Sequence, residues 1–319
     1  MSGKTGIPYA DKSWNPIVGC PLPLVSPGCK FCWARDLHNM RHKAFLAGKK
    51  LSAMYAKPFE EIQFFPERLE QPLHWKKPQT IFIGSQTDLF HPDVKTEWQD
   101  RIFEIALKCP QHKFLFLTKR PKEVVAYYDY FQEICENCAE PNLLWNMPNA
   151  YLGLTICNQP EADKLIPIFL QIPAAHHWLS IEPMLGEINL GNIRQNKENP
   201  KCNNLGWQGK DGGYPYLNCL TGRQYSVLVG EDTNNKIDWV VVGCESGPHA
   251  RLCPLANIER IVDQCDAAGV RVYVKQVQLY RRAKKTDINV EGKDDNRFVT
   301  VLSTNPAEWP EKLKRRDSL

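Results

Sequence analysis

The chain has 319 residues, 43% of them hydrophobic and 24% charged, a composition typical of one large α/β domain or two small domains. Its 40 basic and 36 acidic residues leave a net charge of +4, which by itself does not indicate a nucleic-acid-binding protein. No apolar run approaches the ~20 residues of a membrane span, and the first 16 residues have no signal-peptide core. We therefore expect a cytoplasmic protein whose 12 cysteines are ligands, reactive thiols or core residues, not disulfides.

Seven short apolar runs are typical of strands buried in a parallel sheet. In chain order they are Ile17–Gly19, which is the weakest, and then Ile81–Gly84, Phe114–Thr118, Tyr151–Thr155, Trp178–Ile181, Trp239–Gly243 and Val270–Val274. Helical spacing of apolar residues occurs at Glu97–Lys108 and at Ile258–Ala268, where Gly269 follows as a C-cap. Strands that alternate with helices in this way predict a parallel sheet with right-handed crossovers.

Three cysteines, Cys20, Cys29 and Cys32, follow the first expected strand. A closed structural zinc site has four Cys or His ligands, and a cubane cluster of four irons usually has four thiolates. Three thiolates would leave one iron of a cubane able to bind another molecule. His38 and His42 lie on one face of the helix expected next, so a mixed Cys/His zinc site is an alternative, as are three unrelated cysteines.

Polar residues follow the strands directly. In parallel α/β architectures the functional site lies at the carboxyl ends of the strands. Loops are polar in any protein, so a single residue of this kind is a weak signal, but the repetition favours a shared site beside the cysteines. The residues that carry this argument are Ser85, Thr87, Asp88, Lys119, Cys157, Glu182, Glu245 and Lys275.

Two stretches interrupt the alternation of strands and helices. We interpret residues of about 127–149 and of about 192–236 as insertions that cap the mouth of the fold. Their cysteines, Cys135, Cys138, Cys202 and Cys219, leave a second metal site open as an alternative. We assign residues 1–284 to one domain and residues 285–319 to a charged C-terminal tail, which we expect to be solvated.

The cysteine triad resembles that of the radical S-adenosylmethionine (SAM) enzymes, although their usual spacing, C-x3-C-x2-C, has a shorter first gap. A closer resemblance is to a phage- and prophage-associated three-cysteine-motif family of unknown function. Its motifs are WNP-x2-GC, SPGC-x2-C, an SDLFH-like turn, LTKRP, LSIEP-x-LG, VGxESG and a late KQ. Here they occupy Trp14–Cys20, Ser26–Cys32, Thr87–His91, Leu117–Pro121, Leu179–Gly186, Val242–Gly247 and Lys275-Gln276.

The resemblance to the radical SAM enzymes implies a partial parallel (β/α)6–7 TIM-like barrel and a 4Fe-4S cluster held by Cys20, Cys29 and Cys32. It implies SAM on the free iron, a one-electron reductant such as flavodoxin or ferredoxin, and a 5′-deoxyadenosyl radical that modifies a substrate. The GGE sequence that many of these enzymes carry after the second strand is replaced by Gly84–Asp88. Residues expected around SAM are Phe31, Ser85, Thr87, Asp88, Lys119, Thr155 and Glu182, and those expected in catalysis are Lys119, Glu182 and Lys275.

The phage association favours a nucleobase, a nucleotide or DNA as the substrate. DNA-lesion repair and peptide modification are less favoured alternatives. Two other functions stay open at this point. One is a zinc- or cluster-containing nucleic-acid-binding protein without catalysis, and the other is a metal-independent barrel enzyme such as a phosphate-handling hydrolase. No membrane partner is expected.

Overall fold

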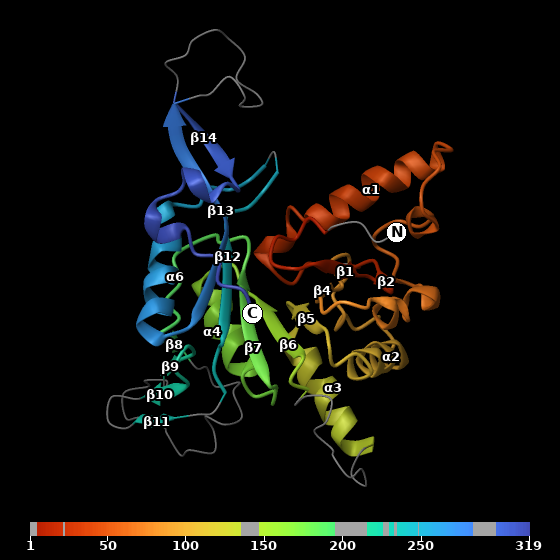
Figure 1. The fold of residues 1–319 in the computed structure, drawn as a ribbon, viewed down its shortest axis with the longest axis horizontal. Coiled ribbons are helices and arrows are strands. Elements are labelled where there is room, and N and C mark those ends of the chain that lie inside the picture. The colour runs from red at the N-terminus through yellow and green to blue at the C-terminus, as the bar shows by residue number, and fades with distance from the viewer. Residues whose placement is uncertain are drawn as a thin grey trace.

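The computed structural model describes residues 5–21, 23–134, 147–194, 216–225, 230–232, 235–247, 249–282 and 298–319. Its centre is an open eight-stranded sheet in the order β1-β4-β5-β6-β7-β12-β13-β14 (Figure 1). Adjacent strands from β1 to β13 are parallel, and only β14 is antiparallel to its neighbour. The strands are β1 (Lys12–Trp14), β4 (Thr80–Ile83), β5 (Lys113–Thr118), β6 (Ala150–Thr155), β7 (His176–Ile181), β12 (Trp239–Gly243), β13 (Arg271–Arg282) and β14 (Phe298–Ser303).

Helices connect the parallel strands in chain order. They are α2 (Thr96–Leu107), α3 (Pro121–Ile134), α4 (Gln159–Phe169) and α6 (Leu255–Ala268), while α1 (Trp33–Leu46) precedes the second strand of the sheet. Both expected helices and six of the seven expected strands are thereby confirmed. Gly269 ends α6 in the left-handed conformation at a φ of 66°, as its position predicted.

The prediction that Ile17–Gly19 opens the main sheet is wrong. The first strand of that sheet is β1, and Ile17–Val18 forms β2, which pairs antiparallel with β3 (Gln63–Phe64). Gly19, which follows β2 directly, has a φ of 109° and lies against the backbone of Glu61. A two-residue strand is too short for its sequence to indicate which sheet it joins. Ile17–Val18 pairs with β3 and therefore belongs to a separate small sheet.

The two faces of the sheet differ because side chains alternate along each strand. One face belongs to the large core that includes Ile102 of α2, Ile166 of α4 and Ile261 of α6. The opposite face, here named the aromatic face, carries one large side chain from each successive strand. These are Phe82, Leu115, Tyr151, Trp178, Trp239 and Tyr273.

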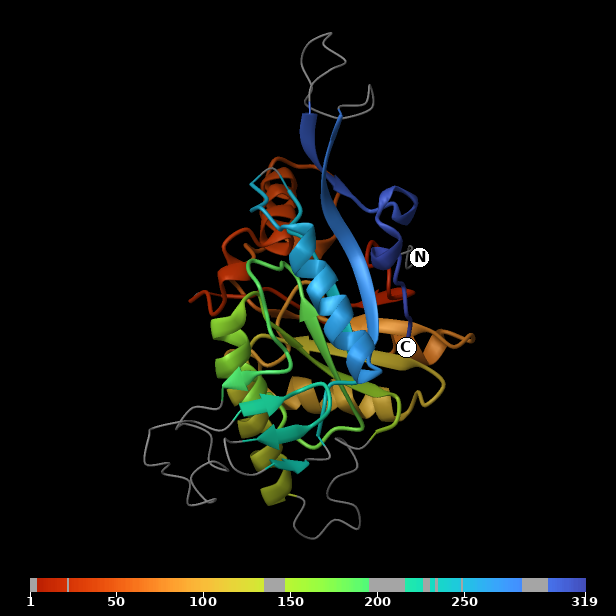
Figure 2. The ribbon, with the colours of Figure 1, turned by 90° about the vertical axis from the view of Figure 1, so that its left-hand side faces the viewer.

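The aromatic face is covered by segments from both ends of the described chain. The Tyr9 ring makes edge contacts with the rings of Trp178, Trp239 and Tyr273 at centroid distances of 6.2, 5.6 and 5.5 Å. From the other end, Asp317 O accepts a 3.0 Å hydrogen bond from Trp239 Nε1. Figure 2 shows α6 and the C-terminal segment on opposite sides of the long strand β13.

The expectation of a solvated tail after residue 285 is wrong for its described part, residues 298–319. β14 pairs with β13, and the two strands extend beyond the rest of the sheet (Figure 1). Farther on, Val274 N donates to Arg315 O and Asp317 N donates to Val272 O. Arg315 also pairs with Asp266 of α6, so the charges of this segment are used in docking it to the fold.

The two expected insertions also need correction. Residues 127–134 are the end of α3, where Tyr127 is a buried core residue, and residues 135–146 lie outside the described residues. The described part of 192–236 forms a small sheet of β8 (Ile193–Arg194), β9 (Tyr216–Asn218), β10 (Arg223–Tyr225) and β11 (Gly230–Asp232). This sheet leads into the amino end of β12, since Ile237 N donates to Cys219 O, so it does not cap the carboxyl ends.

No helix in the described ranges is both long and apolar enough to cross a membrane.

The close approach of Gly153 to Trp178 gives a test of the aromatic face. A Cβ at Gly153 would lie 2.3 Å from Trp178 Cε2 and 2.8 Å from Phe116 O, both in the packed sheet. We expect Gly153→Ala to lower the free energy of unfolding by about 1–3 kcal/mol, because overpacking forces the sheet to shift. Urea denaturation measures this. Gly6→Ala is the matched control, since a Cβ there meets no atom within 4 Å, and equal stability of the two variants would contradict the packing described here.

Candidate functional site

Residues 19–21 and 23–32, together named the cysteine loop, carry Cys20, Cys29 and Cys32 across the carboxyl ends of the parallel strands. Its first end is fixed to the turn after β4. Gly19 N donates a 3.0 Å hydrogen bond to Gln86 O, and Thr87 Oγ1 donates a 2.6 Å hydrogen bond back to Gly19 O. The loop therefore starts at a defined place beside the second strand of the main sheet.

The middle of the cysteine loop is packed against the ends of β6 and β7. Ser26 Oγ accepts from Gly28 N over 3.1 Å and shares a hydrogen bond of 3.6 Å with Cys157 Sγ. A Cβ on Gly28 would lie 2.7 Å from Cys157 Sγ and 3.1 Å from Pro183 Cδ. Only glycine allows this approach without a shift, so Gly28 sets how closely the loop lies on the sheet.

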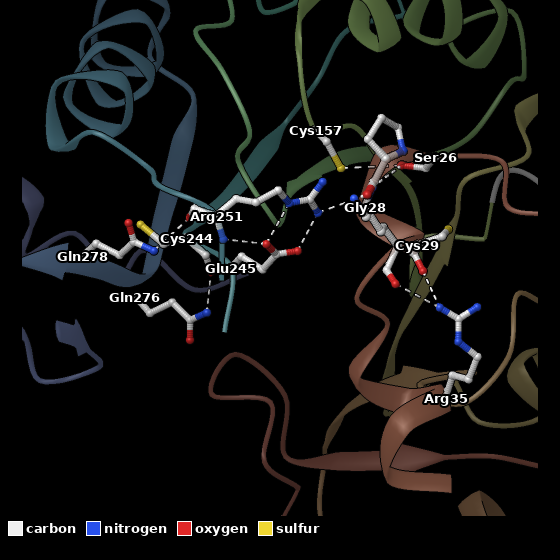
Figure 3. Close-up of polar contacts among 12 residues, drawn as sticks. Ser26, Gly28, Cys29, Arg35, Cys157, Cys244, Glu245, Arg251, Gln276 and Gln278 are labelled. Atoms are coloured by element: carbon white, nitrogen blue, oxygen red, sulfur yellow. Dashed lines mark hydrogen bonds and ion pairs between the residues drawn. The ribbon is translucent and has the colours of Figure 1, made fainter. Parts of the chain in front are cut away.

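An ion pair from the loop after β12 holds the far side of the cysteine loop (Figure 3). Arg251 pairs with Glu245 through two contacts of 2.6 and 2.9 Å and also donates to Pro27 O over 3.1 Å. Although burial raises the pKa of Glu245, the hydrogen bonds and charge of Arg251 hold it below its ordinary value. The Arg251 guanidinium and the His249 ring lie 5.3 and 5.6 Å from the Phe31 ring centroid.

The three thiols of the cysteine loop lie near one another and near a carboxylate. Burial, followed by the negative charges of Asp88, Cys29 and Cys32, raises the pKa of Cys20 to about 11. The nearby Arg120 guanidinium acts in the opposite direction. Three thiols from one loop therefore share one electrostatic neighbourhood.

Asp88 braces the turn that follows β5. Its carboxylate accepts hydrogen bonds from Thr118 Oγ1 at 2.7 Å and from the backbone N of Lys119 at 3.0 Å and of Phe90 at 3.1 Å. The buried Arg120 Nε lies 4.0 Å from the same carboxylate. These contacts place Lys119 at the carboxyl edge of the sheet.

Lys119 is a half-buried cation among the thiols. Burial lowers the pKa of its ammonium, but the charges of Cys29, Asp88, Cys157 and Cys32 outweigh that effect and raise the pKa above its ordinary value. Within the described residues, this ammonium has no hydrogen-bond or ion-pair partner. It is therefore available to pair with an anionic group of a ligand.

A second charged group continues the aromatic face toward the carboxyl ends. Glu182 Oε1 lies 2.9 Å from Lys275 Nζ, and Glu182 Oε2 accepts hydrogen bonds from Tyr9 OH at 3.1 Å and Ser180 Oγ at 3.5 Å. Burial, followed by the charge of Glu182, raises the pKa of Tyr9. Thr155 Oγ1 is buried without a hydrogen-bond partner among the described residues. At the carboxyl ends of the strands, where the cysteine loop lies, the aromatic side chains of this face are therefore followed by polar ones.

No group of three or more Cys, His, Asp or Glu side chains among the residues that the structure describes, Cys20, Cys29 and Cys32 included, has the arrangement of a metal site. The two histidines considered as zinc ligands have partners in the backbone. His38 Nε2 and His42 Nδ1 bond to the backbone oxygens of Lys57 and Tyr55 over 2.9 and 2.8 Å. The two rings therefore hold α1 to the segment that follows it.

The cysteines considered for a second metal site contribute little here. Cys135, Cys138 and Cys202 lie outside the described residues. Cys219 is buried in the core, where burial and then the charge of Cys265 raise its pKa. Cys265 is buried on the apolar face of α6, as expected from its helical spacing.

Several residues expected around the site are used to hold the protein together. Ser85 Oγ donates to Asn15 Oδ1 over 3.1 Å, and Thr87 is bound to Gly19 as described above. Sequence reasoning missed Tyr9, whose partner Glu182 is 173 residues away and leaves no local signal. It also left Arg251 out of the site, and it placed Cys157 at a strand end without giving it a role in binding or catalysis.

The contact between Gly28 and Cys157 predicts a specific pairwise effect. Gly28→Ala should lower the free energy of unfolding by about 1–3 kcal/mol, because its Cβ would overlap the Cys157 sulfur. The double variant Gly28→Ala/Cys157→Ala should recover part of that loss, since it removes the sulfur. Denaturation of the four forms gives the coupling free energy. Strictly additive losses would show that the loop does not rest on Cys157.

Comparison with known proteins places the chain in a family and gives no further relative. No curated protein and no solved structure matches it. Residues 4–303, which include the cysteine loop and every strand of the main sheet, match a protein family described as a protein of unknown function, DUF5131. The chain therefore belongs to the DUF5131 family.

Proposed function

We propose that this protein is a radical SAM enzyme. The observation that carries the proposal is the cysteine loop, which lies across the carboxyl ends of β4, β6, β7 and β12 and brings Cys20, Cys29 and Cys32 into one neighbourhood. Loops at this edge are where parallel α/β enzymes build their active sites. The ammonium of Lys119, which lies near the thiols and has no partner in the part of the chain that the structure describes, supports the same proposal.

The donor set suits an iron–sulfur cluster better than a structural zinc ion. Three thiols are one ligand short of a closed zinc site. In the proposal, Cys20, Cys29 and Cys32 hold a 4Fe-4S cluster and leave one iron to SAM. When bound, the cluster and SAM supply a one-electron cleavage that gives a 5′-deoxyadenosyl radical.

The protein's own residues bind and orient SAM in this proposal. Lys119 pairs with the SAM carboxylate, because a buried anion needs a partner and this ammonium has none within the described chain. Glu182, held by Tyr9 and Lys275, faces the ammonium or ribose of SAM. The hydroxyl of Thr155 supplies a hydrogen bond that it does not make within the protein.

The fold and the substrate complete the proposal. Seven parallel strands in chain order are the sequence of a (β/α) barrel, and we propose that the open sheet is a partial barrel of the radical SAM type. The substrate proposed from the resemblance is a nucleobase, nucleotide or DNA. The residues that would meet it lie on the loop after β12, near Glu245 and His249.

The cluster can be tested by its ligands. We expect anaerobically reconstituted protein to be brown, with absorbance near ~400 nm and close to four irons per chain. Cys29→Ala should lose the iron, because two thiolates remain. Cys265→Ala is the matched control, a buried core cysteine whose loss should leave the iron content unchanged. A colourless protein that binds one zinc ion would instead support the nucleic-acid-binding alternative.

The SAM-binding assignment predicts how two charged residues behave. Lys119→Met should keep the cluster and the fold but lower 5′-deoxyadenosine formation from SAM and dithionite by more than about tenfold. Glu182→Gln should do the same, and adding Lys275→Met to it should cost little more, because the two side chains form one ion pair. Wild-type rates for Lys119→Met and Glu182→Gln would remove both residues from the site while leaving the cluster proposal intact.

A further inference from the structure

The loop that follows β12, here named the clamp loop, begins and ends with a cysteine. It consists of residues 244–247 and 249–253, none of which belongs to a helix or strand. Gly247 has a φ of 105°, a left-handed conformation that suits glycine, and its carbonyl oxygen accepts a 3.2 Å hydrogen bond from Ala250 N. The chain turns back here, so Cys244 and Cys253 meet at the base of the loop.

The two cysteines are in direct contact. Cys244 Sγ donates a hydrogen bond of 3.9 Å to Cys253 O, and both thiols are free and buried. A hydrogen bond from the Cys244 side chain lowers the pKa of Cys253, although burial acts in the opposite direction. The same hydrogen bond, followed by burial, raises the pKa of Cys244. Cys253 is therefore the thiol that ionises more readily, and Cys244 is the donor that stabilises its thiolate.

Two glutamines on β13 hold the base of the clamp loop (Figure 3). Gln276 Nε2 donates a 2.6 Å hydrogen bond to Cys244 O, and Cys244 N donates one of 3.2 Å to Gln276 O. Cys253 N donates over 2.8 Å to Gln278 Oε1, and Gln278 Nε2 donates over 3.0 Å to Arg251 O. Side chains two residues apart on a strand share a face, so one strand fixes the positions of both cysteines. The thiols are thus held together by their surroundings.

The pair lies directly beneath the surface of the protein. Cys244 and Cys253 are 1% and 2% exposed, but Leu252 and Pro254, on either side of Cys253, are exposed. A segment outside helices and strands, with exposed neighbours, opens locally at a small cost in free energy. Such an opening admits a small neutral oxidant, whereas a cysteine packed in the sheet or on a helix face is better protected.

We propose that Cys244 and Cys253 are a redox-active thiol pair that hydrogen peroxide converts reversibly into a disulfide. The Cys253 thiolate attacks one peroxide oxygen, the O–O bond breaks, and the hydroxide released takes up a proton to become water. Cys244 then attacks the resulting sulfenic sulfur, so that an S–S bond forms, the S–O bond breaks and a second water leaves. Two thiols lose two electrons and two protons, and the peroxide gains them. An external dithiol restores the thiols by exchange.

The inference does not depend on the proposed function, but it reaches the candidate site through the clamp loop. Glu245 directly follows Cys244, and Arg251 stands two residues before Cys253. The ion pair of Glu245 and Arg251 holds Pro27 O of the cysteine loop. An S–S bond is only about 2.05 Å long, so its formation draws the ends of the clamp loop together. The oxidation state of the pair is thereby transmitted to the residues that hold the cysteine loop.

Trypsin separates the two cysteines, which gives a direct test on the full-length protein. Cleavage after Lys236, Arg251 and Arg260 places Cys244 in the peptide 237–251 and Cys253 in the peptide 252–260, with no other cysteine in either. After peroxide treatment and alkylation, we expect mass spectrometry to show the two peptides joined, two hydrogens lighter than their sum. Dithiothreitol should separate them. Peptides that stay unlinked, or a link from Cys253 to another cysteine, would overturn the proposal.

Cys109 is the matched control in the same sample. It is a buried cysteine whose pKa is raised by burial alone, and it lies in a different tryptic peptide, 109–113. We expect it to be oxidised at least tenfold more slowly than the pair forms its disulfide. Equal rates would show that Cys244 and Cys253 have no special reactivity and would overturn the proposal.

Single substitutions test which thiol attacks first. Cys244→Ser keeps a hydroxyl donor beside Cys253 but lacks the second thiol, so peroxide should leave a sulfenic acid at Cys253 that dimedone traps. Cys253→Ser should give at least tenfold less dimedone adduct, because the remaining Cys244 has a raised pKa. Equal amounts of adduct in the two variants would overturn the assignment of Cys253 as the attacking thiol.

Discussion

Parallel pairing of strands in chain order is the constraint on which this structure depends. From β1 to β13 each strand lies beside the next one in sequence, so every carboxyl end reaches the same edge of the sheet. Loops that are distant in sequence therefore meet there. The cysteine loop contacts residues that follow four different strands, namely Thr87, Cys157, Pro183 and Arg251.

Along the strands, one face of the sheet changes from apolar to charged side chains toward the carboxyl ends. On one face, large rings such as Trp178 and Tyr273 fill the first part of the strands. Two to four residues farther on, the same face carries Glu182 and Lys275. The rings exclude water from below, and the carboxylate above them is held by Lys275 and Tyr9, because an isolated buried charge would be unstable.

Local sequence patterns predicted the interior of the sheet and failed at its margins. Runs such as FLFLT and WVVVG are apolar throughout because both of their faces are covered, and they appear as β5 and β12. The polar strand β1 has no such signal and is defined by its pairing with β4. The charged residues at the C-terminal end predict a solvated tail, but Arg315 pairs with Asp266 in the folded chain, which the local sequence does not reveal.

The sequence predicted where the residues of the candidate site lie better than it predicted what each side chain does. Lys119, Glu182 and Lys275 are at the strand ends where the rule for parallel sheets places them. Nothing in the sequence distinguishes the ammonium of Lys119, which has no partner among the described residues, from the paired ammonium of Lys275, because the partner of Lys275 is on another strand. Asp88 looked like a ligand-binding residue, and its carboxylate accepts three hydrogen bonds from the chain itself.

The cover of the aromatic face has a consequence for how the protein is made. Tyr9 is synthesised early, yet its ring contacts belong to Trp178, Trp239 and Tyr273. While the ribosome is still adding the later strands, the rings of Phe82 and Tyr151 have no complete partner layer. The aromatic face therefore cannot be completed until β13 has been synthesised, and its apolar surface stays exposed until then.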